Sequence, residues 1–217
     1  MDLPFTQAQF LGVFKSYNEA IFPAHILAYA LGLLCVFLLF RNVKYSGRII
    51  YGILSVFWIW MGAVYHIAYF SSINKAAYGF GALFILEGLI FLYQSLFGKP
   101  AEFKFSGSAK SYIGLAMIAF AMAIYSAIGY FAGHSYPYSP VFGVAPCPVA
   151  IFTFGMLLQP KSGVKFWVII IPLLWSFLGF FAALQLGITE DFGLLISGVL
   201  AAALLALRPG QKEGSLT

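Results

Sequence analysis

The chain has 217 residues, of which 62% are hydrophobic and only 9% are charged. Soluble domains carry about 25% charged residues, so this composition excludes an ordinary soluble domain and indicates an all-α protein with several membrane spans. The net charge of +5 is not the footprint of a nucleic-acid-binding protein. The positions of the basic residues matter more, because they predict how a membrane protein is oriented.

The N-terminal segment, residues 1–19, is short, mixed in composition and weakly amphipathic. Its large apolar side chains fall on one side: Phe5, Phe10, Leu11 and Phe14. We therefore predict an interfacial helix that lies on the membrane surface, with a disordered tail as the alternative. We expect a single membrane domain over residues 20–207 and a short cytoplasmic tail over residues 208–217.

Seven apolar segments follow, and most have the roughly 17–25 residues that a membrane-spanning helix needs. The fifth is interrupted by prolines at its start, and the seventh is short. The segments are Ala20–Phe40, Ile49–Phe70, Ala77–Phe97, Tyr112–Ala132, Val141–Leu158, Val164–Leu186 and Phe192–Leu207. The sequence therefore predicts seven transmembrane helices in one domain.

The basic residues predict the orientation of these helices. Ten of the twelve follow segments one, three, five and seven: Arg41, Lys44, Arg48, Lys99, Lys104, Lys110, Lys161, Lys165, Arg208 and Lys212. Only Lys15 and Lys75 fall on the other side. Because cytoplasmic loops are rich in Lys and Arg, we predict that the N-terminus is outside and the C-terminus is cytoplasmic.

Similar residue spacings recur in the two halves of the chain. Two pairs of spacings match: Pro23–Gly32 with Pro146–Gly155, and Trp58–Gly62 with Trp175–Gly179. This pattern fits a 3+1+3 arrangement, in which two parallel halves flank a linking helix, as in some transporters. Chance is the competing explanation, because 22 glycines in an apolar sequence align with many patterns.

Glu87 lies near the middle of the third segment, in FILEGLIF, with no basic residue within two helical turns. A carboxylate at that depth must be protonated, paired or exposed to a wet cavity, and such residues mark ion and proton pathways. We predict that Glu87 is a proton or cation site that faces an outward cavity. The alternative is a protonated carboxyl group that hydrogen-bonds to a neighbouring helix.

His66 lies near the outer end of the second segment, beside Tyr65 and three residues before Tyr69. This spacing puts His66 and Tyr69 on one face of an α-helix. A neutral histidine there can bind a metal, relay protons or contact a substrate, and a hydrogen-bonded interfacial histidine is the equal alternative. His25 lies at a similar depth in the first segment, so the two histidines also permit a haem between helices.

The stretch GHSYPYSPVFGVAPCPVAIFTFG, residues 133–155, holds four of the ten prolines. We predict a stiff outer loop that contains His134 and leads into a broken start of the fifth segment. Cys147 lies between two prolines, where a thiol and unpaired carbonyls offer ligands for a soft metal ion. We favour the simpler interpretation that Cys147 forms part of the wall of an outward cavity. The weak metal-ligand candidates are His66, His134, Cys147 and His25.

Recognised catalytic patterns are absent from the sequence. It has no Ser-His-Asp or HExxH signature and no Gly-rich phosphate loop, so we assign no catalytic residue and predict no cofactor. Glu190 and Asp191 precede the seventh segment, where acidic side chains commonly cap a helix. Cys35 and Cys147 fall at different depths, so no disulfide is expected between them.

Four blocks of the sequence resemble a bacterial family of multi-pass membrane proteins. They are MDLPFTQAQF with YNEAIFPA, FWIWMGAVYHIAYFSSINKAAYGFGALFILEGLIF, GHSYPYSPVFGVAPCPVAIFTFG and IPLLWSFLGFFAALQLGITEDFGLL. The family that the chain resembles, over nearly its whole length, is domain of unknown function 6064. The resemblance implies one domain in the bacterial cytoplasmic (inner) membrane. It implies no activity, so function must be argued from the residues.

Three functions stay open. The first is a small-solute or ion transporter or permease, which rests on Glu87, the proline-broken fifth segment and the repeat. The second is a metal- or haem-binding redox or enzyme subunit that uses the outer histidines and Cys147. The third is a non-catalytic subunit of a larger membrane complex. The expected surroundings are the lipid bilayer, with self-association or a membrane-complex partner as further options. The predicted substrate or proton site comprises Glu87, His66, Tyr65, Tyr69, His134 and Cys147.

Overall fold

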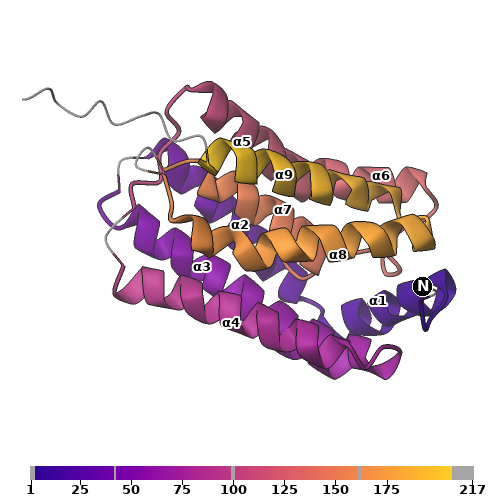
Figure 1. The fold of residues 1–217 in the computed structure, drawn as a ribbon. Helices are drawn as coiled ribbons and strands as arrows, with labels where there is room; N and C mark the ends of the chain where they lie inside the picture. Colours follow the sequence, from indigo (N-terminus) through magenta and orange to yellow (C-terminus); the bar gives the residue numbers. More distant parts are fainter. Residues whose placement is uncertain (1–2, 42, 99–100, 161–162, 207–217) are drawn as a thin grey trace, which may run out of the picture.

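The structure is a computed structural model that describes residues 3–41, 43–98, 101–160 and 163–206. Over these residues the chain forms helices joined by loops, and most helices run along one common axis (Figure 1). Four basic residues used to predict the orientation lie outside the described residues, as does the predicted tail 208–217: Lys99, Lys161, Arg208 and Lys212.

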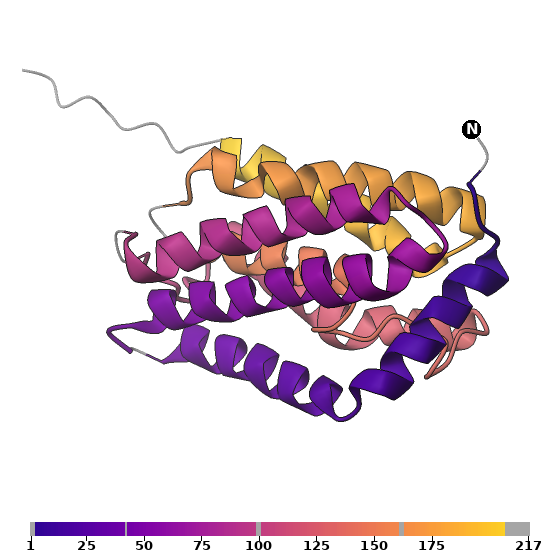
Figure 2. The same cartoon turned by 90° about the horizontal axis from the view of Figure 1, so that it is seen from below.

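The N-terminal helix α1 (Gln7–Ile21) crosses one end of the bundle instead of running along it (Figure 2). It begins at a capping box, in which Thr6 and Gln9 exchange hydrogen bonds between side chain and backbone. A bend of 88° separates it from α2 (Ala24–Phe40). A helix therefore forms where the interfacial helix was predicted, and its position on a membrane surface stays a prediction.

Five helical stretches of the described chain are long and apolar enough to cross a membrane. Each coincides with a predicted segment to within a few residues, which indicates a multi-pass membrane protein. They are Ser46–Ser72, with α3 (Ser46–Trp60), η1 (Met61–Tyr69) and η2 (Phe70–Ser72); α4 (Ala77–Leu96); Ala109–Phe131, with α5 (Ala109–Ala119), η3 (Phe120–Ile124) and α6 (Tyr125–Phe131); Phe166–Leu186, with η4 (Phe166–Ile169) and α8 (Ile170–Leu186); and Thr189–Ala206, with η5 (Thr189–Asp191) and α9 (Phe192–Ala206).

The other two predicted segments form shorter helices. Helix α2 has 17 residues and provides a sixth span only when it is counted together with α1. Helix α7 (Pro146–Leu157) has 12 residues. By length and composition the described chain thus has five or six candidate spans. The predicted count of seven depends on α7, and it stays a prediction together with the orientation and the repeat.

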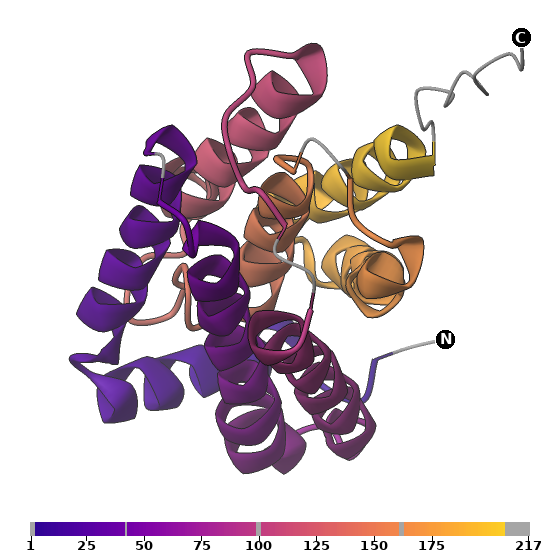
Figure 3. The ribbon, with the colours of Figure 1, turned by 90° about the vertical axis from the view of Figure 1, so that its left-hand side faces the viewer.

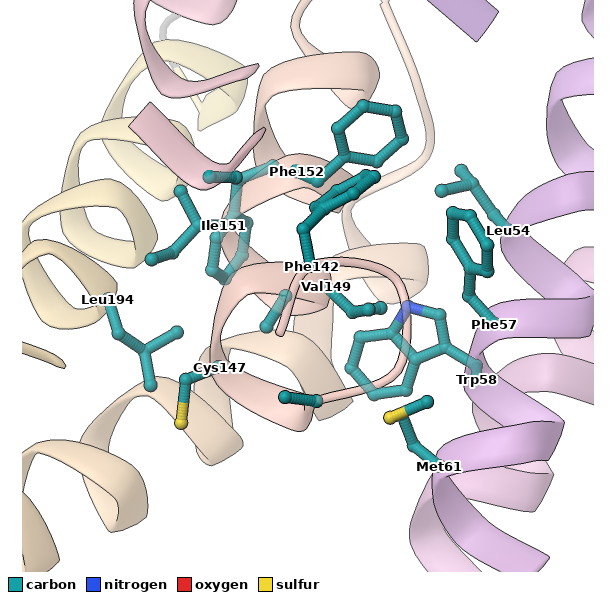
Figure 4. Packing of buried hydrophobic residues seen from close by; sticks show 14 of the residues in the cluster. Leu54, Phe57, Trp58, Met61, Phe142, Cys147, Val149, Ile151, Phe152 and Leu194 are labelled. Atoms are coloured by element: carbon teal, nitrogen blue, oxygen red, sulfur yellow. The ribbon is translucent and has the colours of Figure 1, made fainter. Parts of the chain in front are cut away.

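Helix α7 forms the centre of the molecule. All of its residues are buried, and a view along the bundle shows other helices around it (Figure 3). Phe152 of α7 packs with Phe142 of the preceding loop and Phe57 of α3, with ring centroids 5.0 and 6.3 Å away (Figure 4). The indole Nε1 of Trp58 also donates a hydrogen bond to Thr153 Oγ1, at 2.9 Å. Helix α7 is therefore held by aromatic packing and by a buried hydrogen bond.

Glycines allow the closest approaches between helices. A β-carbon on Gly114 of α5 or Gly155 of α7 would lie 2.6 Å from the carbonyl oxygen of the other residue. A β-carbon on Gly62 of η1 would likewise lie 2.6 Å from the carbonyl oxygen of Gly81 of α4. Such small-residue contacts are typical of helix packing in membranes, where backbones must approach closely to gain van der Waals contact.

Candidate cavity and buried polar groups

A cavity of about 440 Å³ lies at the end of the bundle that α1 crosses. Its wall comes from the N-terminal segment with α1, from η1 and η2, and from parts of α4, α7 and α8. Eight of the lining residues are aromatic: Phe5, Phe10, Phe14, Tyr65, Phe70, Phe80, Trp175 and Phe181. A cavity of this volume, mostly apolar with a few polar groups, is typical of a small-molecule binding site.

Asp191 is the acidic residue in the described wall of this cavity. Its side chain is only 4% exposed, and its Oδ1 accepts a hydrogen bond from the hydroxyl group of Tyr125 in α6. The thiol of Cys147 lies within hydrogen-bonding reach of the same carboxylate. Because a carboxylate can accept about four hydrogen bonds, Asp191 keeps acceptor capacity beyond the bond from Tyr125 and the neighbouring thiol.

Cys147 and Trp175 lie beside each other in the same wall. Cys147 Sγ and Trp175 Nε1 are each 3.8 Å from the position that a β-carbon on Gly179 would occupy. Pro146 and Pro148 fall in the first turn of α7, where a missing backbone N–H removes no hydrogen bond within the helix. The Pro-Cys-Pro sequence therefore begins a regular helix and presents the thiol to the cavity.

His66 lies directly behind this wall. Its ring centroid is 4.6 Å from that of Phe84, 5.1 Å from that of Trp175 and 5.1 Å from that of Tyr65. The residue is fully buried, and neither ring nitrogen has a hydrogen-bond partner in the described part of the chain. Burial of an unpaired polar group is unfavourable, so this arrangement is unusual for a purely structural histidine.

Glu87 lies on the buried face of α4, between Phe84 and Phe91. Both phenylalanines contact the Trp58 ring, at centroid distances of 4.5 and 6.2 Å. Over the residues that the structure describes, neither carboxylate oxygen of Glu87 has a hydrogen-bond partner. Glu87 is ten residues beyond the start of α4, which places it about 15 Å along the helix.

His134 belongs to a separate pair outside the cavity wall. Its Nδ1 lies 3.5 Å from Glu190 Oε1, and both side chains are buried. Glu190 and Asp191 were expected to cap the last helix. The structure instead directs Glu190 to His134 in the loop after α6, and Asp191 to Tyr125 on α6.

Residues of α1 hold the loop that was predicted to be stiff. Asn18 Nδ2 donates hydrogen bonds to the carbonyl oxygens of Pro137 and Ser139, at 2.7 and 2.9 Å. Asn18 Oδ1 lies 3.1 Å from Nε2 of His25, which ties α2 to the same point. His25 is therefore engaged with Asn18 at the junction between α1 and α2.

The segment η1 is a π-helix, in which hydrogen bonds run from residue i to i+5. This wider turn separates His66 from Tyr69, which were expected on one face of an α-helix. Tyr65 and Tyr69 both contact the Tyr17 ring of α1, at 5.4 and 5.2 Å, whereas His66 faces Trp175. Sequence periodicity alone does not reveal a π-helix, because the residue types are those of an ordinary apolar helix.

The structure thus brings two of the predicted site residues, Tyr65 and Cys147, to one cavity. Glu87, His66, Tyr69 and His134 do not line it. Within the described residues, no three or more His, Cys, Asp and Glu side chains are grouped so that they could hold a metal ion. Sequence reasoning missed Asp191 and Trp175, although two adjacent acids in the apolar context of GITEDFG were a usable signal.

Comparison with known proteins assigns the chain to a family. No curated protein and no solved structure matches the chain. Residues 7–213 match the model of a family described as a family of unknown function, DUF6064, in agreement with the resemblance of the four sequence blocks. Because this match covers nearly the whole sequence, the chain belongs to the DUF6064 family.

Proposed function

We propose that the protein is a transporter or permease of the bacterial cytoplasmic membrane. In this proposal a small solute enters the aromatic cavity at the α1 end, and a proton or cation at Glu87 is coupled to its passage. The observation that carries the proposal is the succession of residues along α4. Phe80 lines the cavity, Phe84 covers His66 behind the wall, and Glu87 follows one turn deeper.

Within the described part of the chain, His66 and Glu87 have no hydrogen-bond partner for their buried polar atoms, which supports a role in coupling. A buried polar group without a partner costs about 1–3 kcal/mol, and more when it is charged. A residue kept only for stability would be expected to acquire a partner. A group that exchanges a proton or holds a cation during a transport cycle must instead be free to change its contacts.

The proposal requires movement of the wall between the cavity and Glu87. His66, Phe84 and Trp175 fill the space between them, with ring centroids 4.6–5.1 Å apart. The π-helix η1 carries His66, and π segments inside α-helices are frequent at functional sites. The close contact of Gly62 with Gly81 joins η1 to α4, and the side chains of Ile67 and Ile85 pack against these glycines, so movement of the wall would have to rearrange them.

The test is transport by the purified protein in liposomes on a solid-supported membrane. Rapid addition of benzyltrimethylammonium, phenylalanine or benzenesulfonate is expected to produce a current for at least one of these solutes. Glu87→Gln is expected to reduce that current at least about tenfold, because the amide cannot exchange a proton or hold a cation. Glu102→Gln is the matched control, since it makes the same chemical change at an exposed position.

Two results would contradict the proposed function. One is the absence of any current above that of protein-free membranes for all three solutes. The other is an equal current for the wild-type protein and Glu87→Gln, with equal amounts of protein in the liposomes.

A further inference from the structure

The cavity combines two features that recognise the same kind of ligand. Aromatic rings from α1, η1, η2, α4 and α8 surround it, and their faces carry partial negative charge. A buried carboxylate, that of Asp191, lies in the same wall. Rings attract cations through their faces, and this attraction strengthens where water is excluded.

The charges around the cavity have one sign. Neither lysine at this end of the bundle lines the cavity: Lys75 Nζ donates a hydrogen bond to the carbonyl oxygen of Ser71, and Lys15 lies over the Tyr138 ring. Glu190, next to Asp191 in sequence, is 1% exposed, and no basic side chain other than His134 pairs with it among the described residues. A ligand with positive charge would therefore supply the missing counter-charge.

The surroundings of the Asp191 carboxylate suit a cationic ligand. Tyr125 and Cys147 approach Asp191 from α6 and α7, and the hydroxyl group of Tyr125 donates a hydrogen bond to Oδ1 of Asp191. Donors of this kind stabilise a carboxylate in a fixed position without neutralising its charge, unlike a lysine or arginine. Asp191 lines the cavity together with Trp175, so a ligand in the cavity can reach both side chains.

We propose that this cavity binds a small organic cation, namely a quaternary or protonated amine with an apolar, preferably aromatic, body. Asp191 contacts the positive group, Trp175 and Tyr65 offer ring faces to it, and the phenylalanines of α1 cover the apolar body. The inference rests on the proposed function, since it names the solute class of the same cavity.

The first part of the test needs no variant. The full chain in lipid nanodiscs is titrated by calorimetry with benzyltrimethylammonium and with neopentylbenzene, in which a carbon atom replaces the charged nitrogen at the same shape. Empty nanodiscs correct for partition into lipid, and benzenesulfonate represents an anion. The cation is expected to bind at least about tenfold more tightly than the neutral isostere, and the anion is expected not to bind. Equal affinity for the cation and the neutral isostere, or tighter binding of the anion, would overturn the inference.

The second part assigns the site. Asp191→Asn keeps the shape of the side chain and an oxygen that accepts from Tyr125, so the fold is expected to be retained. It should weaken cation binding at least about tenfold and leave the affinity for neopentylbenzene within about twofold. Glu19→Gln, which removes an exposed charge from α1, is the control and should leave both affinities unchanged. Undiminished cation binding by folded Asp191→Asn would place the cation elsewhere and overturn the assignment.

The inference and the proposed function can fail separately. The cation could bind selectively and depend on Asp191, while no solute produces a current in the liposome experiment. That result would support the binding site and contradict the transport function. Conversely, phenylalanine or benzenesulfonate could produce a Glu87-dependent current while the cation does not bind selectively. That result would support transport and contradict the organic-cation site.

Discussion

Tyr17 shows how a single residue of α1 joins three parts of the molecule. Its hydroxyl group donates a hydrogen bond to the carbonyl oxygen of Val144 at 2.8 Å and accepts one from Trp60 Nε1 at 2.7 Å. The ring also packs between Tyr65 and Tyr69. One side chain therefore links α1 to the loop before α7 and to the span that carries His66.

Tyr17→Phe is expected to destabilise the protein while keeping the ring contacts. The substitution leaves the Trp60 N–H and the Val144 carbonyl group without this partner, which costs about 1–3 kcal/mol when such groups are buried. A protein of this size is then expected to lose at least about 2 °C in melting temperature. Thermal unfolding in detergent measures the change, and Tyr78→Phe, at an exposed tyrosine, is the control. Equal melting temperatures for the two variants would show that the Tyr17 hydrogen bonds contribute nothing.

The residue scale is also where sequence reasoning reached its limit. Glu87 and His66 were recognisable because polar side chains stand out in apolar segments. The partners of Asp191 were not, because Tyr125 and Cys147 are 66 and 44 positions away and meet it only through the packing of α6 and α7. Asp191 was expected to cap the following helix, because acidic residues are common before helices. In the structure its side chain instead contacts residues of other helices.

At the scale of elements, the contact between α5 and α7 depends on two glycines. Gly155→Ala would place a β-carbon 2.6 Å from the Gly114 carbonyl oxygen and 2.8 Å from the Ile118 side chain. The helices must then separate, and overpacking of this kind typically costs about 1–3 kcal/mol. We expect a lower melting temperature and a smaller fraction of monodisperse protein in size-exclusion chromatography.

Gly79→Ala provides the control for this prediction. Gly79 is in α4, and a β-carbon there would have no neighbouring atom within 4 Å. The substitution should leave the melting temperature unchanged or raise it slightly, because alanine favours the helix over glycine by about 1 kcal/mol. A loss at Gly79 as large as the loss at Gly155 would show that the close contact with α5 is not what makes Gly155→Ala destabilising.

The positions of the long helices were the most predictable feature of this structure. Apolar runs bounded by Pro, Gly or charged residues gave the long helices to within a few residues, because a spanning helix satisfies all its backbone hydrogen bonds internally. The departures have local causes. Pro23 stands directly before α2, so the helix begins four residues later than the apolar run. The cavity was not predictable, because its wall comes from segments that are adjacent only after folding.

At the scale of the whole molecule, the described basic residues divide between the two ends of the bundle. The loops after α2, α4 and α7 lie at one end, whereas α1 lies at the other (Figure 1). Six basic residues belong to the former end: Arg41, Lys44, Arg48, Lys104, Lys110 and Lys165. Lys15 and Lys75 belong to the end with the cavity. The positive-inside rule thus predicts that the cavity faces away from the cytoplasm.

Reporter fusions test this orientation. Alkaline phosphatase, which is active only outside the cytoplasm, should be active when fused to the N-terminus, and green fluorescent protein should fluoresce when fused to the C-terminus. Exchange of the two reporters should abolish both signals. If both termini were on the same side, an even number of crossings would follow and the seven-span prediction would be wrong. A cytoplasmic N-terminus would contradict the outward orientation of the cavity.

The burial of α7 has a consequence for how the protein is made. A helix of 12 residues extends about 18 Å, whereas the hydrocarbon layer is about 30 Å thick, so α7 cannot rest in lipid alone. Its ends would expose unpaired backbone groups to the acyl chains. Helices α3 and α5 precede it, but α8 and α9, which also pack on it, are synthesised later. The nascent chain must therefore keep α7 sheltered, by earlier helices or by the insertion machinery, until α8 and α9 complete the enclosure.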